Sequence, residues 1–536
     1  MSVNISDNSK AICCVTTIKE SNRAAEILCN YFNKISGGDF KISNETLESN
    51  NIIFNLTDEY GDSGFAYKEE EGNLYFFGKN EQAFVYAVYD LLERVVGCKY
   101  YSRSYDYIPN EPNLTLDIDN YFFVPSVDYR EIYYKEFEDK EFAEKHKMAP
   151  SKIHEGWGFW CHSFQKLLPN EEYFDKHPEY FALIDGKRNP KGEPCLSNPE
   201  VKKIMIENLG KFMGEKPECK YWSVSQNDDN LYCRCEECQK KVDYDDSQMG
   251  PILTFVNEVA QEFPDKVIST LSYWYSRKPP KNTRPAENVH IMVCNIEANR
   301  GLPIEIDLQS IESKNEYLAW SSISGNVSLW DYNIQFANLV SPFPNLRTLG
   351  SNMRFFVNNK LKLLFSQCNR EIGGEFNELR GYMLAKLAWD PTYDTDYLIK
   401  DFCNGYYRDA APYIIEYINK LHDAQEEKNE RLDIFGGPIK AKDTYLKLEL
   451  YNQYEELFDK AEYAVKDDED LHQRVKNARL PLYYAGIVLQ YGSTGERMNK
   501  IIKFASIARL MGLKMVEEWK ITVDKFVTDS VIALEK

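Results

Sequence analysis

Long hydrophobic runs are missing from this chain of 536 residues. A membrane-spanning helix needs about 20 consecutive apolar residues, and no stretch of this chain approaches that length. The opening residues, MSVNISDNSK, also lack the charged start and apolar core of a secretory signal. We therefore expect a cytoplasmic protein with no membrane partner, or a secreted one if a signal peptide has been removed.

An excess of positive charge is absent as well. Lys and Arg total 64 against 84 Asp and Glu, which gives a net charge of −20. A surface of that sign repels a phosphate backbone, so we expect no nucleic-acid partner. The 13 cysteines are an odd number spread along a long chain. They do not resemble the disulfide framework of a small secreted domain, which favours a reducing compartment.

Three common catalytic motifs are missing. No Gly-rich phosphate loop follows a predicted strand, no His/Glu spacing is of the metalloprotease type, and no serine lies between glycines as in the hydrolase elbow. These absences argue against a dinucleotide-binding enzyme, a zinc protease and a serine hydrolase of the elbow type.

Aromatic residues, in contrast, are abundant. The 37 Tyr, 29 Phe and 8 Trp make up 14% of the chain. The simpler interpretation is a set of large aromatic cores. The alternative is a cleft lined with rings, on whose flat faces the C–H groups of a sugar can stack.

The chain divides into three predicted regions within an α/β fold class. Residues 1–120 alternate strand-like and helix-like segments, which predicts a small N-terminal α/β domain. Residues 396–536 carry apolar stripes at helical spacing, which predicts a C-terminal helical domain. Such stripes could also form a homodimer interface.

The central region, residues 121–395, is predicted to be a (β/α)8 TIM-like barrel, because strand and helix units repeat over a length typical of that fold. An eighth strand is expected around EYFALID. A doubly wound open sheet is the competing fold, but the Gly-rich loop that would support it is absent. Seven strands are visible: VDYREIYY, EGWGFWCHSF, KYWSVSQND, KVISTLSYWY, NVHIMVCNIE, NVSLWDYNI and LKLLFSQC.

Carboxylates gather where these strands end, and a barrel brings strand ends to one pocket. Taken singly, an Asp at a strand end is more often a turn former or helix cap. As a set they suit glycoside hydrolysis, in which one carboxyl protonates the leaving oxygen and another activates water or attacks the sugar. The candidates are Asp228 and Asp229 after one strand, together with the neighbouring amide of Asn227; Glu297 and Asp331 at two other strands; and Glu375 and Glu378 after the last.

Further side chains are candidates for shaping a sugar subsite. Arg130 in the first strand can clamp hydroxyls or a carboxylate, although a buried ion pair is an equal alternative. His162 can hydrogen-bond a hydroxyl or serve only the structure. Tyr273, Trp330 and Tyr332 supply rings near the strand ends.

The motif YCRCEEC places Cys233, Cys235 and Cys238 within six residues. Three thiols at this spacing can bind zinc, but a closed tetrahedral site needs a fourth ligand, which Cys195 or Cys161 would supply from a distance. The alternative is a reduced thiol cluster that packs the loop. A structural zinc is thus the one cofactor to consider, and none is required for catalysis.

Several motifs carry a resemblance: AFVYAVYDLLERVVGCKYY, HSFQKLLPNEEYFDKHPEYFALIDGKR, CLSNPEV, WSVSQNDDNLYCRCEEC and EFNELRGYMLAKLAWDP. Together they resemble a bacterial family of glycoside hydrolase-like proteins of unknown function, over about residues 70–420. The three-region layout is more distantly similar to the microbial α-glucuronidases. The N-terminal region and the first-strand arginine resemble those of the β-N-acetylhexosaminidases.

The resemblance implies an exo-acting enzyme that hydrolyses a terminal sugar. It implies Asp228 as general acid, with Asp229 as the alternate, and Asp331 or Glu375 as base or nucleophile. It also implies that Arg130 holds ring hydroxyls. Carboxyls about 5 Å apart predict retention of the anomeric configuration and those about 6.5–9.5 Å apart predict inversion, towards which we lean. The alternatives are a substrate-assisted β-N-acetylhexosaminidase and a noncatalytic carbohydrate-binding protein.

Overall fold

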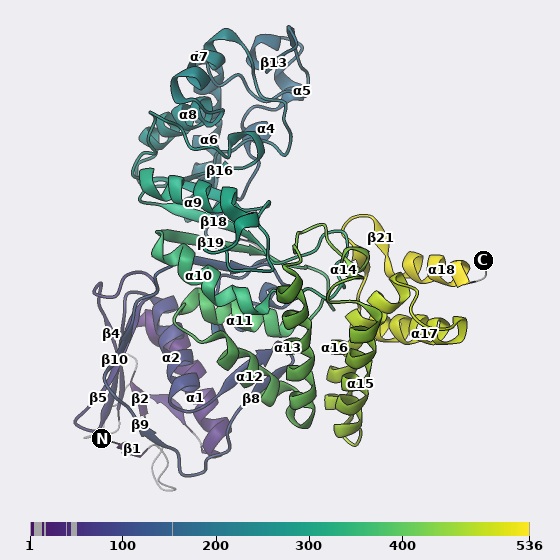
Figure 1. The fold of residues 1–536 in the computed structure, drawn as a ribbon. Helices are drawn as coiled ribbons and strands as arrows, with labels where there is room; N and C mark the ends of the chain where they lie inside the picture. Colours follow the sequence, from purple (N-terminus) through teal and green to yellow (C-terminus); the bar gives the residue numbers. More distant parts are fainter. Residues whose placement is uncertain are drawn as a thin grey trace.

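The protein is described by a computed structural model that covers residues 2–4, 13–15, 18–38, 40–43, 51–152 and 154–534. Figure 1 shows an N-terminal sheet with its helices, a central parallel sheet, and a set of C-terminal helices to one side. No helix among the described residues is long and apolar enough to cross a membrane.

Strands and helices alternate in the N-terminal region, as its sequence predicts. Helices α1 (Asn22–Ser36) and α2 (Glu81–Arg94) pack side by side against the sheet. The Asn80 side chain caps α2 by accepting from the Ala83 amide, and ten of the fourteen helix residues are buried. The sheet has the order β10 (Tyr121–Phe123), β5 (Phe65–Glu70), β6 (Asn73–Gly78), β4 (Ile52–Leu56), β2 (Cys13–Val15), β3 (Lys41–Ser43).

The central sheet confirms all seven predicted barrel strands. Every neighbouring pair in it is parallel, so the carboxyl ends of the strands meet at one edge. Its order is β11 (Tyr129–Ile132), β19 (Leu361–Gln367), β18 (Val327–Tyr332), β17 (Val289–Cys294), β16 (Val267–Ser272), β15 (Tyr221–Ser223), β12 (Trp157–Phe159).

The expected eighth strand is wrong. The segment around EYFALID instead forms β13 (Leu183–Ile184), which pairs antiparallel with β14 (Lys187–Arg188) in a hairpin apart from the central sheet. Asp185 and Gly186 both have positive φ, 50° and 77°, as a two-residue turn of this kind requires. In the described part of the chain the central sheet is therefore a curled array of seven parallel strands, with one further parallel bridge between Glu131 of β11 and Ala149. A full (β/α)8 barrel is not confirmed.

Helices follow most strands and cover the sheet. They are α6 (Pro199–Glu215), α7 (Glu236–Asp245), α8 (Met249–Glu262), α9 (Ile311–Ile323), α10 (Leu349–Asn358) and α11 (Asn377–Trp389). Strand β17 shows the result of this cover, because all six of its residues are buried.

The C-terminal region is helical, as predicted. Its long helices are α12 (Thr395–Tyr406), α13 (Ala411–Lys428), α15 (Leu448–Ala464), α16 (Glu469–Val488), α17 (Thr494–Met511) and α18 (Val523–Leu534).

Two connections of this region turn back to the carboxyl edge of the central sheet. They are the loop 429–437 and the hairpin of β20 (Met515–Glu517) and β21 (Ile521–Thr522). The Phe336 amide donates to the Ile434 carbonyl at 2.7 Å, and the Leu339 amide donates to the Val516 carbonyl at 2.9 Å. These bonds fix both connections beside the strand ends.

Candidate active site

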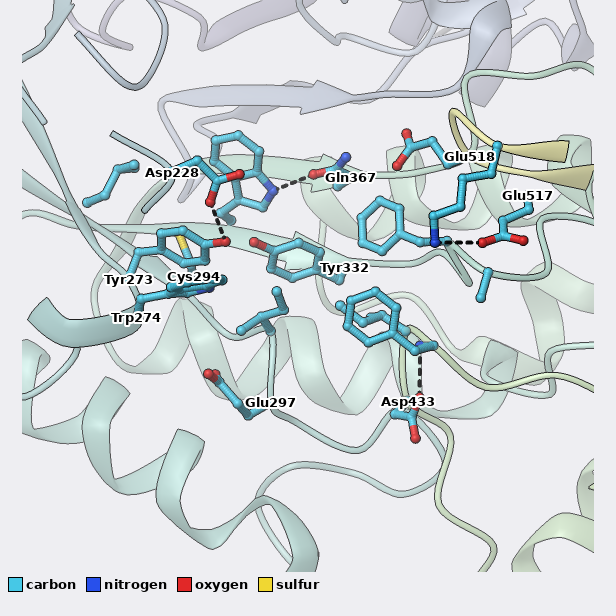
Figure 2. Close-up of a pocket in the computed structure, with 18 of the residues that line it drawn as sticks. Asp228, Tyr273, Trp274, Cys294, Glu297, Tyr332, Gln367, Asp433, Glu517 and Glu518 are labelled. Carbon is cyan, nitrogen blue, oxygen red and sulfur yellow. Dashed lines mark hydrogen bonds and ion pairs between the residues drawn. The ribbon is translucent and has the colours of Figure 1, made fainter. Parts of the chain in front are cut away.

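A cavity of about 890 Å³ lies at the carboxyl edge of the central sheet (Figure 2). Several strand ends and both C-terminal connections contribute to its wall, which brings together segments far apart in the sequence. The residues that line it and bear on its chemistry are His162, Asp228, Tyr273, Trp274, Cys294, Glu297, Trp330, Tyr332, Gln367, Arg431, Asp433, Phe435, Glu517, Glu518 and Lys520.

Asp228 is the predicted general acid, and its side chain faces this cavity. The Tyr273 hydroxyl donates to its Oδ1 at 3.0 Å (Figure 2). Burial, with the nearby Asp228 charge as a further cause, raises the pKa of Tyr273 well above its usual value. Tyr273 therefore stays protonated around neutral pH and remains a donor to the carboxylate.

The turn that carries Asp228 is held from both sides. Next to it, the backbone N–H of Asn227 donates to Oε1 of buried Glu193 at 2.9 Å. The Gln226 side chain donates to the Ser276 hydroxyl at 2.6 Å. Hydrogen bonds to two separate segments thus restrict where the Asp228 carboxylate can go.

The neighbouring residue Asp229 makes a different contact and does not face the cavity. Its Oδ1 accepts from the Leu231 amide at 2.8 Å, which is a local turn contact, and it does not line the cavity. Asn227 does not line it either. Of the three polar residues that end this segment, the structure brings only Asp228 to the cavity.

Glu297, one of the predicted site residues at the strand ends, is the second such carboxylate in the wall. Its Oε1 forms an ion pair with the Arg277 guanidinium at 2.5 Å, and 41% of its side chain is exposed. The Arg431 side chain donates to the Glu297 carbonyl at 2.5 Å. A loop of the C-terminal region thus supports the segment that carries this carboxylate.

Aromatic rings form much of the remaining wall, and those of Tyr273, Trp330 and Tyr332 are among them. Trp330 and Tyr332 stack with ring centroids 6.4 Å apart, and the Trp330 indole donates to Gln367 at 2.8 Å. His162 also lines the cavity, and its Nδ1 lies 2.7 Å from the Gln226 carbonyl. Because a carbonyl only accepts, Nδ1 carries a proton there and Nε2 is left for other partners.

Asp331, predicted as a base or nucleophile, does not line the cavity. Side chains alternate along a strand, so Trp330 and Tyr332 face the cavity while Asp331 points to the other face. There its two carboxylate oxygens accept from the side-chain amides of Asn295 at 2.8 Å and Asn333 at 2.9 Å.

Glu375 and Glu378 are likewise outside the cavity. Glu375 is buried, and its Oε2 lies 2.6 Å from the Arg380 guanidinium in an ion pair. Burial raises the pKa of Glu375, and it also raises the pKa of Glu378, which lies near Glu136. Glu375 is therefore part of the packed interior, whereas Glu378 is half-buried in the first turn of helix α11.

Arg130 is on the first strand, as predicted, but it does not line the cavity that holds Asp228. Its guanidinium donates to the carbonyls of Val127 and Lys147 and lies 4.9 Å from the Trp389 ring centroid. It lines a separate cavity of about 740 Å³ that also includes Lys220, just before β15. The reason is position along the strand, because Arg130 lies near the amino end of β11.

Sequence reasoning missed the contribution of the C-terminal region. Asp433 pairs with Lys440 at 2.9 Å, and Glu517 pairs with Lys520 at 2.9 Å, all four lining the cavity. Asp433 and Lys440 lie between helices α13 and α15, and Glu517 and Lys520 lie in the β20–β21 hairpin, where no strand-end pattern of the central sheet marks them. Only the folding back of those connections reveals them.

Four cysteine sulfurs form a group away from this cavity. Ligand atoms of Cys195, Cys233, Cys235 and Cys238 lie within 4.8 Å of one another, whereas Cys161 is not part of the group. None of the four lines the cavity that holds Asp228 and Glu297.

Comparison with known proteins gives a family and a fold. The structure is similar to that of a GH138 enzyme targeting pectin rhamnogalacturonan II, with a TM-score of 0.55 and 12% identity over 98% of this chain and 79% of that one. A weaker likeness is to CpGH84B, with a TM-score of 0.47 and 11% identity over 99% of this chain and 98% of that one. Another is to a β-hexosaminidase of Streptomyces plicatus, with a TM-score of 0.44 and 10% identity over 78% of this chain and 93% of that one.

No curated protein sequence matches the chain. Residues 100–419 match a domain of unknown function, DUF4838, which is more than half of the length. The protein is therefore a member of the DUF4838 family.

Proposed function

We propose that the protein is an exo-acting glycoside hydrolase, with Asp228 as general acid and Glu297 as the second carboxylate. One observation carries this proposal: a single cavity at the carboxyl edge of a parallel sheet holds both carboxylates among aromatic rings. Carboxylate pairs serve glycosidic bond cleavage, and rings serve sugar stacking. The likeness in fold to a GH138 enzyme is consistent with this chemistry.

Asp228 suits the acid role by its position. Its side chain is exposed to the cavity, and no cation in the described part of the chain forms an ion pair with it. Its Oδ1 accepts from the Tyr273 hydroxyl. A protonated Asp228 can deliver its proton to the glycosidic oxygen, while Tyr273 keeps the carboxyl oriented.

Glu297 replaces Asp331 and Glu375 as the proposed base or nucleophile. The latter two are held by Asn295 and Asn333, or by Arg380, and do not reach the cavity. Arg277 contacts Oε1 of Glu297 and orients the carboxylate. In an inverting mechanism Glu297 would activate water, and in a retaining one it would attack the anomeric carbon.

An exo-acting enzyme needs a pocket that closes around a terminal sugar. The loop 429–437 and the β20–β21 hairpin supply such a wall, through Asp433, Phe435 and Glu517. Charged pairs in this wall can hydrogen-bond the hydroxyls of the last sugar ring.

Substrate assistance is the second mechanism to weigh. It would use an adjacent carboxylate beside the acid to orient the acetamido group. Asp229 is adjacent but is occupied with the Leu231 amide and lies outside the cavity. The geometry therefore favours the two-carboxylate mechanism.

The test is a screen of purified protein against aryl glycosides and natural oligosaccharides that include α- and β-hexosides, N-acetylhexosaminides and uronides. The double variant Asp228→Asn/Glu297→Gln runs beside the wild type to exclude a contaminating hydrolase. Turnover by the wild type alone supports the proposal. Turnover that is confined to N-acetylated sugars would favour substrate assistance. Sugar binding without turnover of any substrate would indicate a noncatalytic binding protein.

A further inference from the structure

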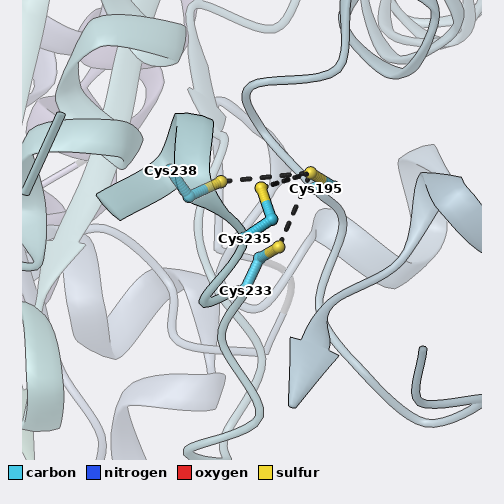
Figure 3. A group of neighbouring side chains, drawn as sticks. All are labelled: Cys195, Cys233, Cys235 and Cys238. Carbon is cyan, nitrogen blue, oxygen red and sulfur yellow. Dashed lines mark hydrogen bonds between the residues drawn. The ribbon is translucent and has the colours of Figure 1, made fainter. Parts of the chain in front are cut away.

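The four-cysteine group joins two segments that are 38 residues apart in the sequence. Cys195 follows the β13–β14 hairpin, Cys233 and Cys235 lie in the loop after β15, and Cys238 is in the first turn of α7 (Figure 3). Cys195 and Cys238 are buried, and the other two are half-buried. The group is thus only partly exposed to solvent.

The three sulfur separations from Cys195 are close to those of a tetrahedral metal site, and all four sulfurs lie within 4.8 Å of one another. From Cys195 they are 3.5 Å to Cys233, 3.6 Å to Cys235 and 3.9 Å to Cys238. With Zn–S bonds of about 2.3 Å, the edge of a regular tetrahedron is about 3.8 Å. One ion at the centre would therefore contact all four sulfurs with little movement.

Neighbouring groups also suit metal-bound thiolates. The Leu183 amide donates to Cys233 Sγ at 3.4 Å, and the Arg188 guanidinium lies 3.9 Å from the same sulfur. Four thiolates around a divalent ion leave a net negative charge, which such N–H donors and a nearby cation stabilise. Both donors come from the β13–β14 hairpin, the element that replaced the expected barrel strand.

We propose that Cys195, Cys233, Cys235 and Cys238 bind one Zn²⁺ ion as a structural site. An all-sulfur set selects a soft metal, and four protein ligands leave no position open for substrate. On binding, the thiols release their protons to solvent, and no electron is transferred. The sequence alone left Cys161 and Cys195 as alternatives for the fourth ligand, and the structure assigns Cys195.

The site would stabilise the turn that carries Asp228. Glu193, two residues before Cys195, accepts from the Asn227 amide at 2.9 Å, and its own amide donates to the Leu231 carbonyl at 3.0 Å. Cys233 follows Leu231 by two residues. The ion would thus fasten the two segments just beyond the point where they hold the Asp228 turn. Only this consequence rests on the proposed function, since metal binding itself does not.

Metal analysis of the full-length protein tests the proposal. Protein purified under reducing conditions without chelator is expected to contain about one zinc ion per chain, measured by inductively coupled plasma mass spectrometry. Cys195→Ser and Cys238→Ser should each reduce the zinc content and weaken its retention on dialysis against a chelator. Cys161→Ser, which changes a cysteine outside the group, should retain the wild-type content.

A second measurement covers the case in which a variant fails to fold. Wild-type protein is stripped of metal by a chelator and titrated with Co²⁺, which should give the absorption of a tetrahedral thiolate site at one equivalent and be displaced by Zn²⁺. The proposal would be overturned if the metal-free protein bound no Co²⁺, or if these cysteines were found to form disulfides. Stoichiometric iron in place of zinc would overturn the assignment of the metal. None of these readings depends on glycosidase activity.

Discussion

The Tyr273 hydroxyl donates a hydrogen bond to Oδ1 of Asp228 at 3.0 Å, across the cavity edge where strands β15 and β16 end. The two residues are 45 positions apart, and the parallel pairing of their strands brings them together. This contact is the direct link between the proposed acid and the ring-lined wall. It also defines which oxygen of Asp228 is left to face a substrate.

Tyr273→Phe should lower turnover of a glycoside substrate about 10- to 100-fold. A hydrogen bond to a charged group contributes about 1.5–3 kcal/mol, and each 1.4 kcal/mol corresponds to about tenfold in rate. Steady-state kinetics with an identified substrate measures the effect. Tyr107→Phe removes the hydroxyl of an exposed tyrosine remote from the cavity lining and should leave turnover unchanged. Equal rates for the wild type and Tyr273→Phe would show that the contact plays no part.

Glu375→Ala should destabilise the fold by about 3–5 kcal/mol, because it leaves the buried Arg380 guanidinium without its carboxylate. Denaturant unfolding followed by fluorescence measures the loss. Glu305→Ala changes an exposed glutamate and serves as the control. If the two variants were equally stable, the interpretation of Glu375 as a structural residue would be wrong.

Glu136→Gln should stabilise the protein at alkaline pH. Burial and the Glu378 carboxylate raise the pKa of Glu136 to about 8, an effect that Arg103 partly offsets. Between about pH 4.5 and 8 the folded state therefore holds a proton that the unfolded state has lost, so wild-type stability falls as pH rises through this window.

The substituted amide does not ionise, so the Glu136→Gln variant escapes that loss. Its melting temperature should exceed the wild-type value at pH 8.5 by more than it does at pH 5. Differential scanning calorimetry at both pH values makes the comparison. A difference that does not change with pH would refute the assigned ionisation.

The sequence predicts the central strands well because each is a short apolar run that ends in polar residues. The same pattern placed Asp228 and Glu297 at the edge of the sheet where the cavity lies. The expected eighth strand failed for a local reason, because the Asp185-Gly186 turn folds its apolar run into a hairpin. Turn geometry, not hydrophobicity, decided that segment.

Some predicted site residues lie outside the cavity, for reasons that the sequence does not show. Asp331 is one residue from the cavity-facing rings of Trp330 and Tyr332, so it points to the opposite face of the strand. Glu375 looked free because Arg380, its partner, lies in the following helix. Asp433 and Glu517 reach the cavity only through the folding of the helical region. Long-range packing of this kind leaves no periodic signal in a sequence.

The central claim is that Asp228 donates the proton to the leaving group. The most direct test is whether the loss of activity in Asp228→Asn depends on how good the leaving group is. The measurement is kcat/KM of wild type, Asp228→Asn and Asp229→Asn on two glycosides, one with a good and one with a poor leaving group. Asp228→Asn should lose about 10²–10⁴-fold on the poor leaving group and far less on the good one, because only the poor one needs the proton. Asp229→Asn, whose amide oxygen can still accept from Leu231, should stay near wild type. Equal losses on both substrates, or the larger loss in Asp229→Asn, would contradict the account.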